Sequence, residues 1–303
     1  MAFAQRLIEI AIKLASNTQT NQPATFSESG TDTVTLSGSR TKVRIQNSGA
    51  PSGSTASIDV YGMTPSLMNQ LATLGLVFNL VPRNTLTISA GTKSNLAIVY
   101  SGTIVAAYGN YDAAPDVPFH FECNSGLADA VAPAPVSSFP GPTDVATIMS
   151  GFARQMNLGF ENNGVTIKLS NPYFAGNIWT QMRACAEHAN INAEIVNGNV
   201  LAIWPKGASR TGGSIPLIAK GAGMIGYPAY TQQGIIVKAV FNPQVSFGGL
   251  IQVQSSLKVV NDIGTWAVNK LDLALDSLEP KGQWMSTIYA YNPKYPRPIP
   301  PQA

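Results

Sequence analysis

Short runs in which apolar and polar residues alternate, each ended by a turn signal, are the feature of this 303-residue sequence that most restricts its fold. In the first run Ile8, Ile10 and Ile12 alternate with other residues, a period of two that predicts a strand with one buried face. The same residues would also fit one turn of an amphipathic helix. The further alternating runs before residue 140 are 34–36, 43–45, 58–60, 85–89, 97–99, 103–108 and 119–123. Many short strands with regular turns predict a sandwich or a barrel.

One short helix is predicted among these strands, at residues 65–74. Thr64 is a favourable N-cap, Pro65 stands at the first helical position, and Gly75 follows the end. The apolar stripe of this helix is Leu67, Leu71 and Leu74. Residues 1–140 are therefore predicted to form a first β-barrel-like domain that contains one short helix.

A different pattern follows the proline-rich stretch 132–142, which is typical of a linker. The apolar faces of two predicted helices are Val145, Ile148, Met149, Phe152 and Met156, and then Ile178, Trp179, Met182, Cys185, Ala186 and Ala189. A strand at 165–169 lies between them, and Asn197-Gly198 predicts a hairpin that joins 194–196 to 200–204. The sequence therefore predicts a small αβαββ module at residues 142–206.

Strand-like runs return at 235–240, 250–254, 257–259 and 266–275, so residues 208–285 are predicted to form a second β-barrel-like domain. The glycine-rich stretch 207–226 is interpreted as a flexible connector. Residues 286–303 are assigned to a proline-rich arm, with five prolines after Asn292. Its last residues cannot join a sheet, so an extended arm that clasps a neighbour or frays is expected. The predicted fold class is mainly β with an inserted α+β module.

Charged side chains are scarce. They make up 12% of the chain, against roughly 25% in an average soluble domain. Disorder does not explain this, because aliphatic and aromatic residues are not depleted. Obligate interfaces do lose charge and keep neutral polar groups, so a subunit largely covered by neighbours is favoured. Arg40, Lys42 and Arg44 are spaced by two along a predicted strand and are expected to share a solvated or interface face, not a nucleic-acid site.

No apolar run approaches the roughly 20 residues that span a bilayer, since the stretch 71–81 is broken by Gly75 and Asn79. Arg6, Glu9 and Lys13 interrupt any signal-peptide core. With two cysteines and no signal, a soluble protein made in the cytoplasm with free thiols is expected.

Two histidines and two cysteines raise the possibility of a zinc site, as His120 with Cys123 and Cys185 with His188. On a strand, however, His120 and Cys123 point to opposite faces, and Cys185 continues an apolar helix stripe. Buried thiols and incidental histidines are the preferred interpretation.

Catalytic patterns are equally weak. No G-x-S-x-G turn follows a strand, and no glycine loop has phosphate-binding spacing. The candidate carboxylates are scattered, and Asp272 and Asp276 are expected on a solvated face; the set is Glu122, Asp129, Asp262, Asp272 and Asp276. We therefore predict that the protein is not an enzyme, with no catalytic, cofactor-binding or metal-binding residues.

Three groups of segments resemble the baseplate hub proteins of contractile-tailed bacteriophages. In the first, Tyr61-Gly62 closes a strand before a short helix, as in that family; in the second, Ile98 opens an apolar-aromatic-x-Gly-x-Ile strand that is followed by Pro115-Asp116. The segments are 3–8, 40–45, 57–63 and 66–71, then 98–104 and 115–119, then 224–228, 241–243, 253–256, 264–268 and 282–284. Their order and spacing carry the resemblance over residues 3–286; the middle module and the proline arm stand outside it.

The resemblance implies two tail-tube-like β-barrel domains per subunit and a homotrimeric ring. Such a ring adapts a sixfold tail tube, or its initiator protein, to a threefold central spike, and leaves a channel for transient DNA passage without specific nucleic-acid binding. Baseplate wedge and tape-measure proteins are further expected partners. The expected location is the virion, after assembly in the host cytoplasm, with no membrane span and with any cell-wall lysin residing in another protein.

Two other functions stay open at this point. A receptor-binding or other β-rich tail protein would display exposed aromatic residues at loop tips, for which Tyr108, Tyr111 and the cluster from Tyr289 to Tyr295 are candidates. These tyrosines would also fit ordinary strand edges. An enzyme of an unrecognised class is the remaining alternative.

Overall fold

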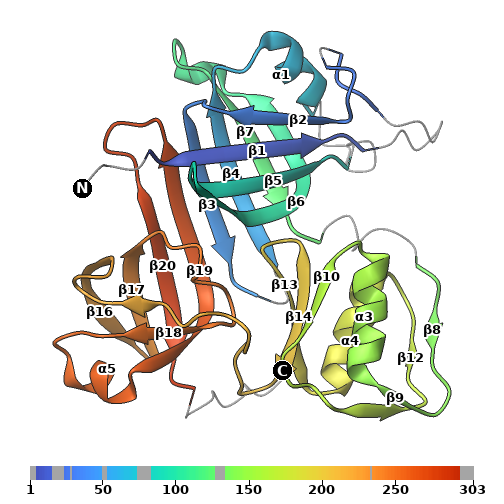
Figure 1. The fold of residues 1–303 in the computed structure, drawn as a ribbon. Coiled ribbons are helices and arrows are strands. Elements are labelled where there is room, and N and C mark those ends of the chain that lie inside the picture. Colours follow the sequence, from blue (N-terminus) through green and yellow to red (C-terminus); the bar gives the residue numbers. More distant parts are fainter. Residues whose placement is uncertain are drawn as a thin grey trace. The chain divides into compact units, whose positions relative to one another are not determined.

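The computed structural model describes residues 5–15, 24–27, 29–49, 53–73, 83–126, 134–232 and 234–293. The chain forms two compact units. Unit one contains residues 1–46, 54–128 and 273–284, and unit two contains residues 47–53, 129–272 and 285–303. Strands far outnumber helices in both units, so the predicted mainly β fold is confirmed (Figure 1). The predicted boundaries at 140, 206 and 285 stay predictions, because these units group the chain differently.

Unit one is built from antiparallel strands in the order β3-β4-β7-β6-β5-β1-β2. The strands are β1 (Leu7–Lys13), β2 (Thr33–Ser37), β3 (Thr41–Asn47), β4 (Ser54–Tyr61), β5 (Thr85–Thr92), β6 (Asn95–Gly109) and β7 (Pro118–Asn124). The alternation predicted from the sequence is visible in the burial of β1, where Ile8, Ile10 and Ile12 lie in the core and Lys13 is exposed. Side chains of one face thus make the core and those of the other face remain available for polar contacts.

Two expectations for unit one need correction. The runs 97–99 and 103–108 belong to a single 15-residue strand, β6, whose pairing with β7 shifts register between Ile104 and Ala106. The helix α1 (Pro65–Leu71) has the predicted N-cap, because Thr64 Oγ1 accepts from the Leu67 N–H. It ends earlier than expected, since Ala72 already has extended backbone angles. Gly75 lies outside the described residues. A short 3-10 helix, η1 (Tyr111–Ala113), follows β6.

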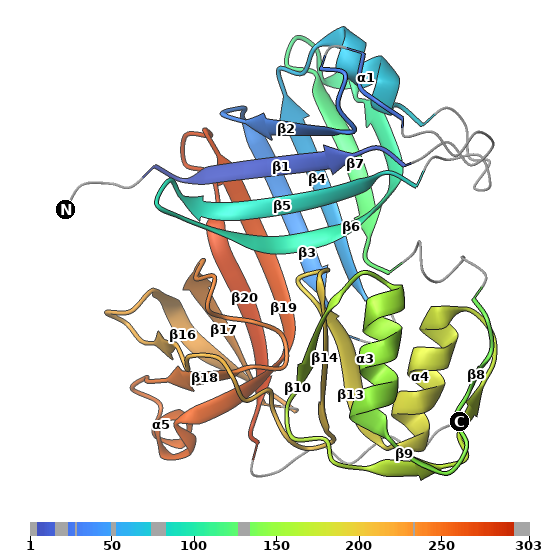
Figure 2. The ribbon, with the colours of Figure 1, turned by 45° about the vertical axis from the view of Figure 1, so that its right-hand side comes forward.

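Within unit two, the helices α3 (Val145–Gln155) and α4 (Ile178–His188) pack against the sheet β10-β14-β13 (Figure 2). The strands of this sheet are β10 (Gly159–Asn162), β13 (Ile191–Val196) and β14 (Val200–Pro205). Four shorter strands of this α/β module form two small antiparallel ribbons: β9 (Pro142–Asp144) pairs with β11 (Lys168–Ser170), and β8 (Ser137–Ser138) pairs with β12 (Tyr173–Phe174). Both predicted helical faces are buried in one cluster that includes Phe152, Met182 and Cys185. The Asn197-Gly198 hairpin is confirmed: both residues have positive φ and Val196 pairs with Val200.

Three details of the module differ from the prediction. The strand β10 was not foreseen, and the run predicted at 165–169 forms a strand only from Lys168. Val165 is instead held by Asn162, whose side chain exchanges two hydrogen bonds with the Val165 backbone. The described part of the predicted linker contains β8 and the first residue of β9.

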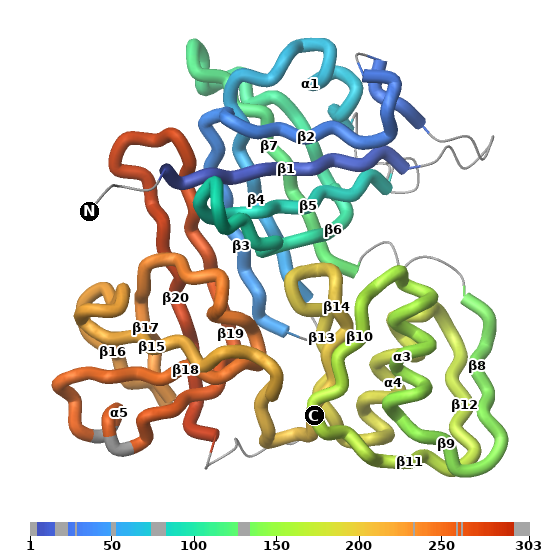
Figure 3. The backbone as a smooth tube through the Cα atoms, viewed as in Figure 1, coloured from blue at the N-terminus to red at the C-terminus, as the bar shows by residue number. Residues whose placement is uncertain are grey.

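The remaining strands of unit two are ordered β16-β17-β20-β19, with β18 paired to both β19 and β15 (Figures 1 and 3). They are β15 (Leu217–Ile218), β16 (Met224–Thr231), β17 (Gly234–Val240), β18 (Leu250–Val253), β19 (Thr265–Ser277) and β20 (Trp284–Tyr291), and the helix α5 (Lys258–Ile263) precedes β19. Three predictions were wrong. The run 257–259 enters α5, the connector 207–226 contains β15 and the start of β16, and residues 286–291 of the proposed arm belong to β20. Residues 294–303 lie outside the described part.

Each unit includes the tip of a hairpin whose neighbouring residues in sequence belong to the other unit. Residues 273–284, the end of β19 with the turn and first residue of β20, belong to unit one, and residues 47–53, between β3 and β4, belong to unit two. The chain therefore passes between the units at five points, after residues 46, 53, 128, 272 and 284. Neither unit is a continuous piece of sequence.

Candidate functional site

The basic residues of β3 bind the β19–β20 turn within unit one. Arg44 Nη1 lies 2.6 Å from Asp276 Oδ1, and Asp276 is only 6% exposed. The second carboxylate oxygen of Asp276 accepts the Gln283 N–H at 2.7 Å. Lys42 Nζ lies 3.6 Å from Glu279 Oε1 in the same turn. The expectation of a solvated Asp276 is therefore wrong, whereas Arg40, Lys42 and Arg44 share one face, as expected, and remain 29%, 34% and 42% exposed beside the turn.

Arg40 completes this cluster. Its guanidinium carbon lies 3.7 Å from the centroid of the Tyr61 ring, and Nη2 lies 2.9 Å from Asp116 Oδ2. A second carboxylate, Glu279, lies 3.6 Å from Arg40 Nε. The hydrogen bond that Arg40 donates to Asp116 is the largest cause of the raised pKa of Arg40. The cluster holds the turn in place and leaves little cationic surface for a phosphate.

His120 lies on β7 between β4 and β6. Its Nδ1 is 2.6 Å from Asp59 Oδ1, its Nε2 is 3.7 Å from Glu122 Oε1, and its ring is 5.1 Å from that of Tyr108. The hydrogen bond to Asp59 is the main cause of the raised pKa of His120, and burial opposes it. The neighbouring Cys123 is buried on the other face, where burial raises the pKa of its thiol. The geometry joins His120 to carboxylates and not to sulfur.

Cys185 and His188 lie on α4. Cys185 is fully buried, and burial raises the pKa of its thiol to about 12. The His188 ring lies 5.8 Å from that of Phe174. Among the described residues no three His, Cys, Asp or Glu side chains form a cluster that could hold a metal ion.

The other candidate carboxylates are dispersed. Asp272 Oδ2 forms an ion pair with Lys270 Nζ at 3.3 Å on β19, and its side chain is 26% exposed. Glu122 lies near His120. Asp129 and the side chain of Asp262 lie outside the described part of the chain. Glu122, Asp272 and Asp276 belong to three separate clusters of contacts, each with its own cationic partner.

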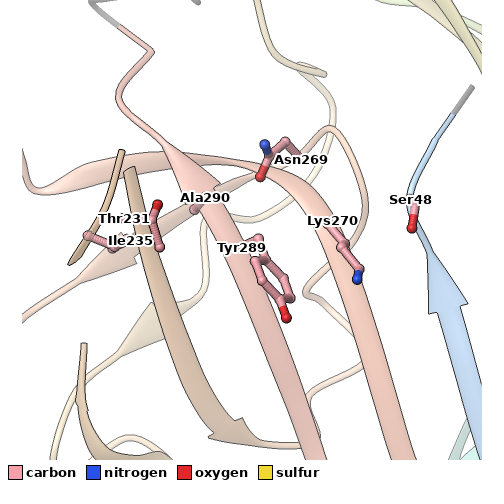
Figure 4. A pocket seen from close by; sticks show the side chains of 7 residues that line it. All are labelled: Ser48, Thr231, Ile235, Asn269, Lys270, Tyr289 and Ala290. Carbon is pink, nitrogen blue, oxygen red and sulfur yellow. The ribbon is translucent and has the colours of Figure 1, made fainter. Parts of the chain in front are cut away.

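A polar cavity in unit two has a volume of about 220 Å³ and opens beside β19 and β20 (Figure 4). Figure 4 shows the Tyr289 ring next to the Lys270 side chain, and the Lys270 Nζ lies 4.9 Å from the ring centroid. Asn269 Oδ1 is buried there without a hydrogen-bond partner among the described residues. The lining residues are Ser48, Thr231, Ile235, Asn269, Lys270, Tyr289 and Ala290. A polar group of about the size of a side chain could form hydrogen bonds with the lining residues, and Lys270 supplies one positive charge.

A larger cavity in unit two, of about 650 Å³, surrounds Arg210. Arg210 binds both oxygens of Glu161, at 3.1 and 2.6 Å, and Ser246 Oγ and the Phe247 carbonyl at 3.3 and 3.2 Å. The hydrogen bonds from Arg210 keep the pKa of Glu161 below its usual range. The hydrogen bonds of the Arg210 guanidinium thus connect β10 of the α/β module with the loop 246–249.

A receptor-binding protein was expected to expose tyrosines at its loop tips. Tyr108 and Tyr111 are 46% and 67% exposed around the end of β6, whereas Tyr289 lines the cavity described above. The sequence reasoning missed Tyr227 and Tyr230 on β16, which are 72% and 54% exposed. Buried and exposed residues do not alternate along β16, so this strand cannot be recognised from a period of two in the sequence. Tyr295 is not among the described residues.

No helix in the described part of the chain is long and apolar enough to cross a membrane.

Comparison with solved structures shows the fold. A 43 kDa tail protein of prophage MuSo2 from Shewanella oneidensis matches with a TM-score of 0.59 and 10% sequence identity, over 94% of this chain and 97% of that chain. A tail protein from Neisseria meningitidis MC58 matches with a TM-score of 0.59 and 7% identity, over 93% of this chain and 96% of that one. No curated protein matches the sequence.

Comparison with protein-family models shows the relationship directly. The model described as baseplate hub gp41 matches residues 23–283, which is most of the chain and agrees with the resemblance found in its segments. Structural components of phage tails thus share both its family signature and its fold. The chain belongs to the baseplate hub gp41 family.

Proposed function

We propose that this hub protein closes, in three copies, into a ring at the end of a phage tail. The ring adapts the sixfold tail tube, or its initiator protein, to a threefold central spike. Each subunit contributes two tube-type β domains, so that three subunits present six equivalent positions. Closed point-group symmetry of this kind is the usual arrangement of homo-oligomers.

The family match over residues 23–283 carries this proposal. Composition supports it, because only 12% of the residues are charged and charge-poor surfaces are typical of obligate contacts. Arg40, Arg44 and Arg210 are bound to carboxylates of the same chain. A neutral, polar channel through such a ring would hold DNA weakly, because it would lack strong attraction for the phosphates.

The further partners we propose are the central spike and, beyond it, baseplate wedge and tape-measure proteins. The protein acts in the virion after assembly in the host cytoplasm and performs no catalysis of its own. Any cell-wall hydrolysis during infection then belongs to another tail protein.

Light scattering on the purified full chain, with electron microscopy of the same sample, tests the ring. We expect a mass three times the 32.0 kDa of one chain and threefold-symmetric particles, either alone or after addition of the spike protein of the same phage. A single-copy mass at all concentrations, with tube and spike proteins both present, would contradict the proposal.

Receptor binding is the second candidate function, and one observation favours it. Tyr111 is 67% exposed beside Tyr108 at the end of β6, where aromatic side chains could stack on a sugar. Binding of the isolated protein to a glycan array, lost in Tyr111→Ser, would support this function over a purely structural role.

A further inference from the structure

The α/β module of unit two has a hydrophobic core of its own. The cluster that contains Phe152, Met182 and Cys185 draws all of its buried members from residues 145–203. The sheet β10-β14-β13 is also separate, because none of its strands pairs with a described strand of the larger sheet. A core that closes on itself is what allows part of a chain to move as one body.

The apolar contact between this module and the strands that follow it is small. One buried cluster of four residues lies there, with Val196, Ala202 and Trp204 from the module and Phe247 from the loop 246–249. Gly49 lies against the Phe247 ring from the other side of the loop's sequence. Two bodies in one chain are expected to move relative to each other unless their interface is large and hydrophobic.

The polar contact depends on Arg210, which is bound unequally to the two sides. Its guanidinium donates to both oxygens of Glu161 in the module, at 2.6 and 3.1 Å. Toward the loop it donates only to neutral oxygens, Ser246 Oγ at 3.3 Å and the Phe247 carbonyl at 3.2 Å. A two-bonded pair of opposite charges is the stronger of these attachments. Arg210 therefore belongs with the module and makes a weaker contact with the loop.

The chain leaves the module directly after this point. The Thr211 N–H donates to Asn163 Oδ1 at 2.8 Å, and the Thr211 hydroxyl donates to the same oxygen. Residues 212–215 then form no hydrogen bond within the described part of the chain. A Cβ at Gly212 or Gly213 would meet no atom within 4 Å. Hinges consist of a few such residues that absorb changes in backbone angles.

A cavity of about 650 Å³ lies where the module, this connecting segment and the following loops meet. Its lining comes from residues 161–163 of the module, from 210–215 and from the stretch 244–250. Protein interiors are normally filled to the density of organic crystals. Atoms that border a gap lack contacts on one side, so they oppose displacement less than packed atoms do. The module therefore has room to move on this side.

We propose that the α/β module swings about Gly212 and Gly213, and that the hydrogen bonds from Arg210 to the loop 246–249 are the latch of its closed position. On opening, Arg210 travels with the module because its side chain stays bound to Glu161, and the cavity widens. The other connection of the module, residues 127–133, lies outside the described residues. The device belongs to a single chain and operates with or without the proposed ring.

Hydrogen exchange in the unmodified full chain is the first test. Opening breaks the bond from the Arg210 N–H to the Gly248 carbonyl, 2.8 Å long, and leaves the Thr211 N–H bound to Asn163. After correction for intrinsic rates, the Arg210 amide hydrogen should exchange at least about tenfold faster than that of Thr211. Mass spectrometry with single-residue fragmentation measures both. Equal rates, or a faster Thr211, would overturn the proposed hinge.

Distances between spin labels are the second test. Both native cysteines are buried, so labels are placed through Tyr173→Cys in the module and Lys238→Cys on β17, which are exposed positions. An excess of unlabelled protein removes distances between copies. Ser246→Ala with Phe247→Leu should raise the ratio of open to closed molecules at least about tenfold, because a hydrogen bond from a charged donor and an aromatic pair are both lost.

Ser214→Ala is the matched control, since Ser214 lines the same cavity and forms no hydrogen bond within the described part of the chain. It should leave the distances unchanged. Circular dichroism and the melting temperature establish that each variant is folded. Distances that stay the same in the double variant, or that change equally in the control, would overturn the latch. Either result leaves the ring untouched, because these distances lie within one chain and the ring is measured by mass.

Discussion

At the scale of single residues, the ion pair between Arg44 and Asp276 joins positions 232 residues apart. The carboxylate is 94% shielded from solvent, while the side chain of Arg44 is 42% exposed. A carboxylate of this kind depends on its partners, because an unpaired charge in a protein interior is costly. Among the described residues, only the Gln283 N–H would still donate a hydrogen bond to the Asp276 carboxylate if the arginine side chain were removed.

We therefore predict that Arg44→Ala lowers the free energy of unfolding by about 2 kcal/mol, the range of hydrogen bonds to charged groups. Lys42→Ala is the matched control on the same strand. Its ion pair with Glu279 spans 3.6 Å, and the Glu279 side chain is 25% exposed against 6% for Asp276, so its loss should cost less than about 1 kcal/mol. Urea denaturation measures both, and equal effects would contradict the assigned role of Asp276.

His120 should make stability depend on pH. The groups that face it are Asp59 on β4, Glu122 on its own strand and the Tyr108 ring on β6. The pKa of His120 is raised in the folded protein. Its contribution to the free energy of unfolding is therefore fully present below the pKa of the unfolded state, about 6.5, and is lost as the pH rises through the pKa of the folded state. The melting temperature of His120→Gln should fall below that of the wild type more at about pH 6 than at about pH 8.5. A difference that is the same at both pH values would exclude this role.

At the scale of elements, the alternating pattern predicts strands well where one face is buried and the other is not. The strand β17 shows this, with Ile235, Val237 and Ala239 in the core. The pattern fails for β16, which is exposed on both faces and has no alternation to detect. The start of α5 was assigned to a predicted strand at 257–259, although Gly264, with a φ of +71°, is a helix-ending signal in the sequence.

The candidate site was less predictable than the fold. The spacing of Arg40, Lys42 and Arg44 correctly indicates a shared face, but not what covers it. Asp276 and Glu279, which contact these residues, lie more than 230 positions later in the chain. A single sequence gives no information about which distant positions come close in space. The exposure of Tyr227 was equally hidden, because it depends on the position of β16 at one end of the strand order.

The attachment of the α/β module depends on one glycine. Phe247 and Trp204 pack edge to face at 6.4 Å, and the residue after Phe247, Gly248, has a φ of +75°. A Cβ at Gly248 would lie 2.9 Å from the Trp204 ring and 3.1 Å from Arg210 Cδ. A side chain there would strain the backbone and also displace the residues that join the module to its loop.

Gly248→Ala should accordingly lower the free energy of unfolding by about 2 kcal/mol or more, through left-handed strain and steric overlap. Gly212→Ala is the control, because a Cβ at that position meets no atom within 4 Å. Thermal unfolding followed by tryptophan fluorescence measures the loss and reports on Trp204 as well. An unchanged melting temperature in Gly248→Ala would show that the loop can move aside.

At the scale of the whole molecule, unit one cannot be obtained by cutting the chain once. The fragment 1–128 lacks residues 273–284, which supply Asp276 and Glu279 to the basic residues of β3. We predict that this fragment does not unfold cooperatively in calorimetry. Joining 273–284 to its C-terminus through a flexible Gly-Ser linker should restore a cooperative transition. A cooperative transition in the fragment alone would show that the hairpin tip is dispensable.

Each unit contains a hairpin tip whose flanking residues belong to the other unit, and this arrangement affects how the subunit would respond to tension. Domains joined by one linker separate under tension once that linker straightens, without loss of internal structure. Here the chain crosses between the two units at five points, after residues 46, 53, 128, 272 and 284, so a pull that parts the units is shared by five segments of backbone. A subunit connected in this way should yield less under tension than one whose domains are joined by a single linker.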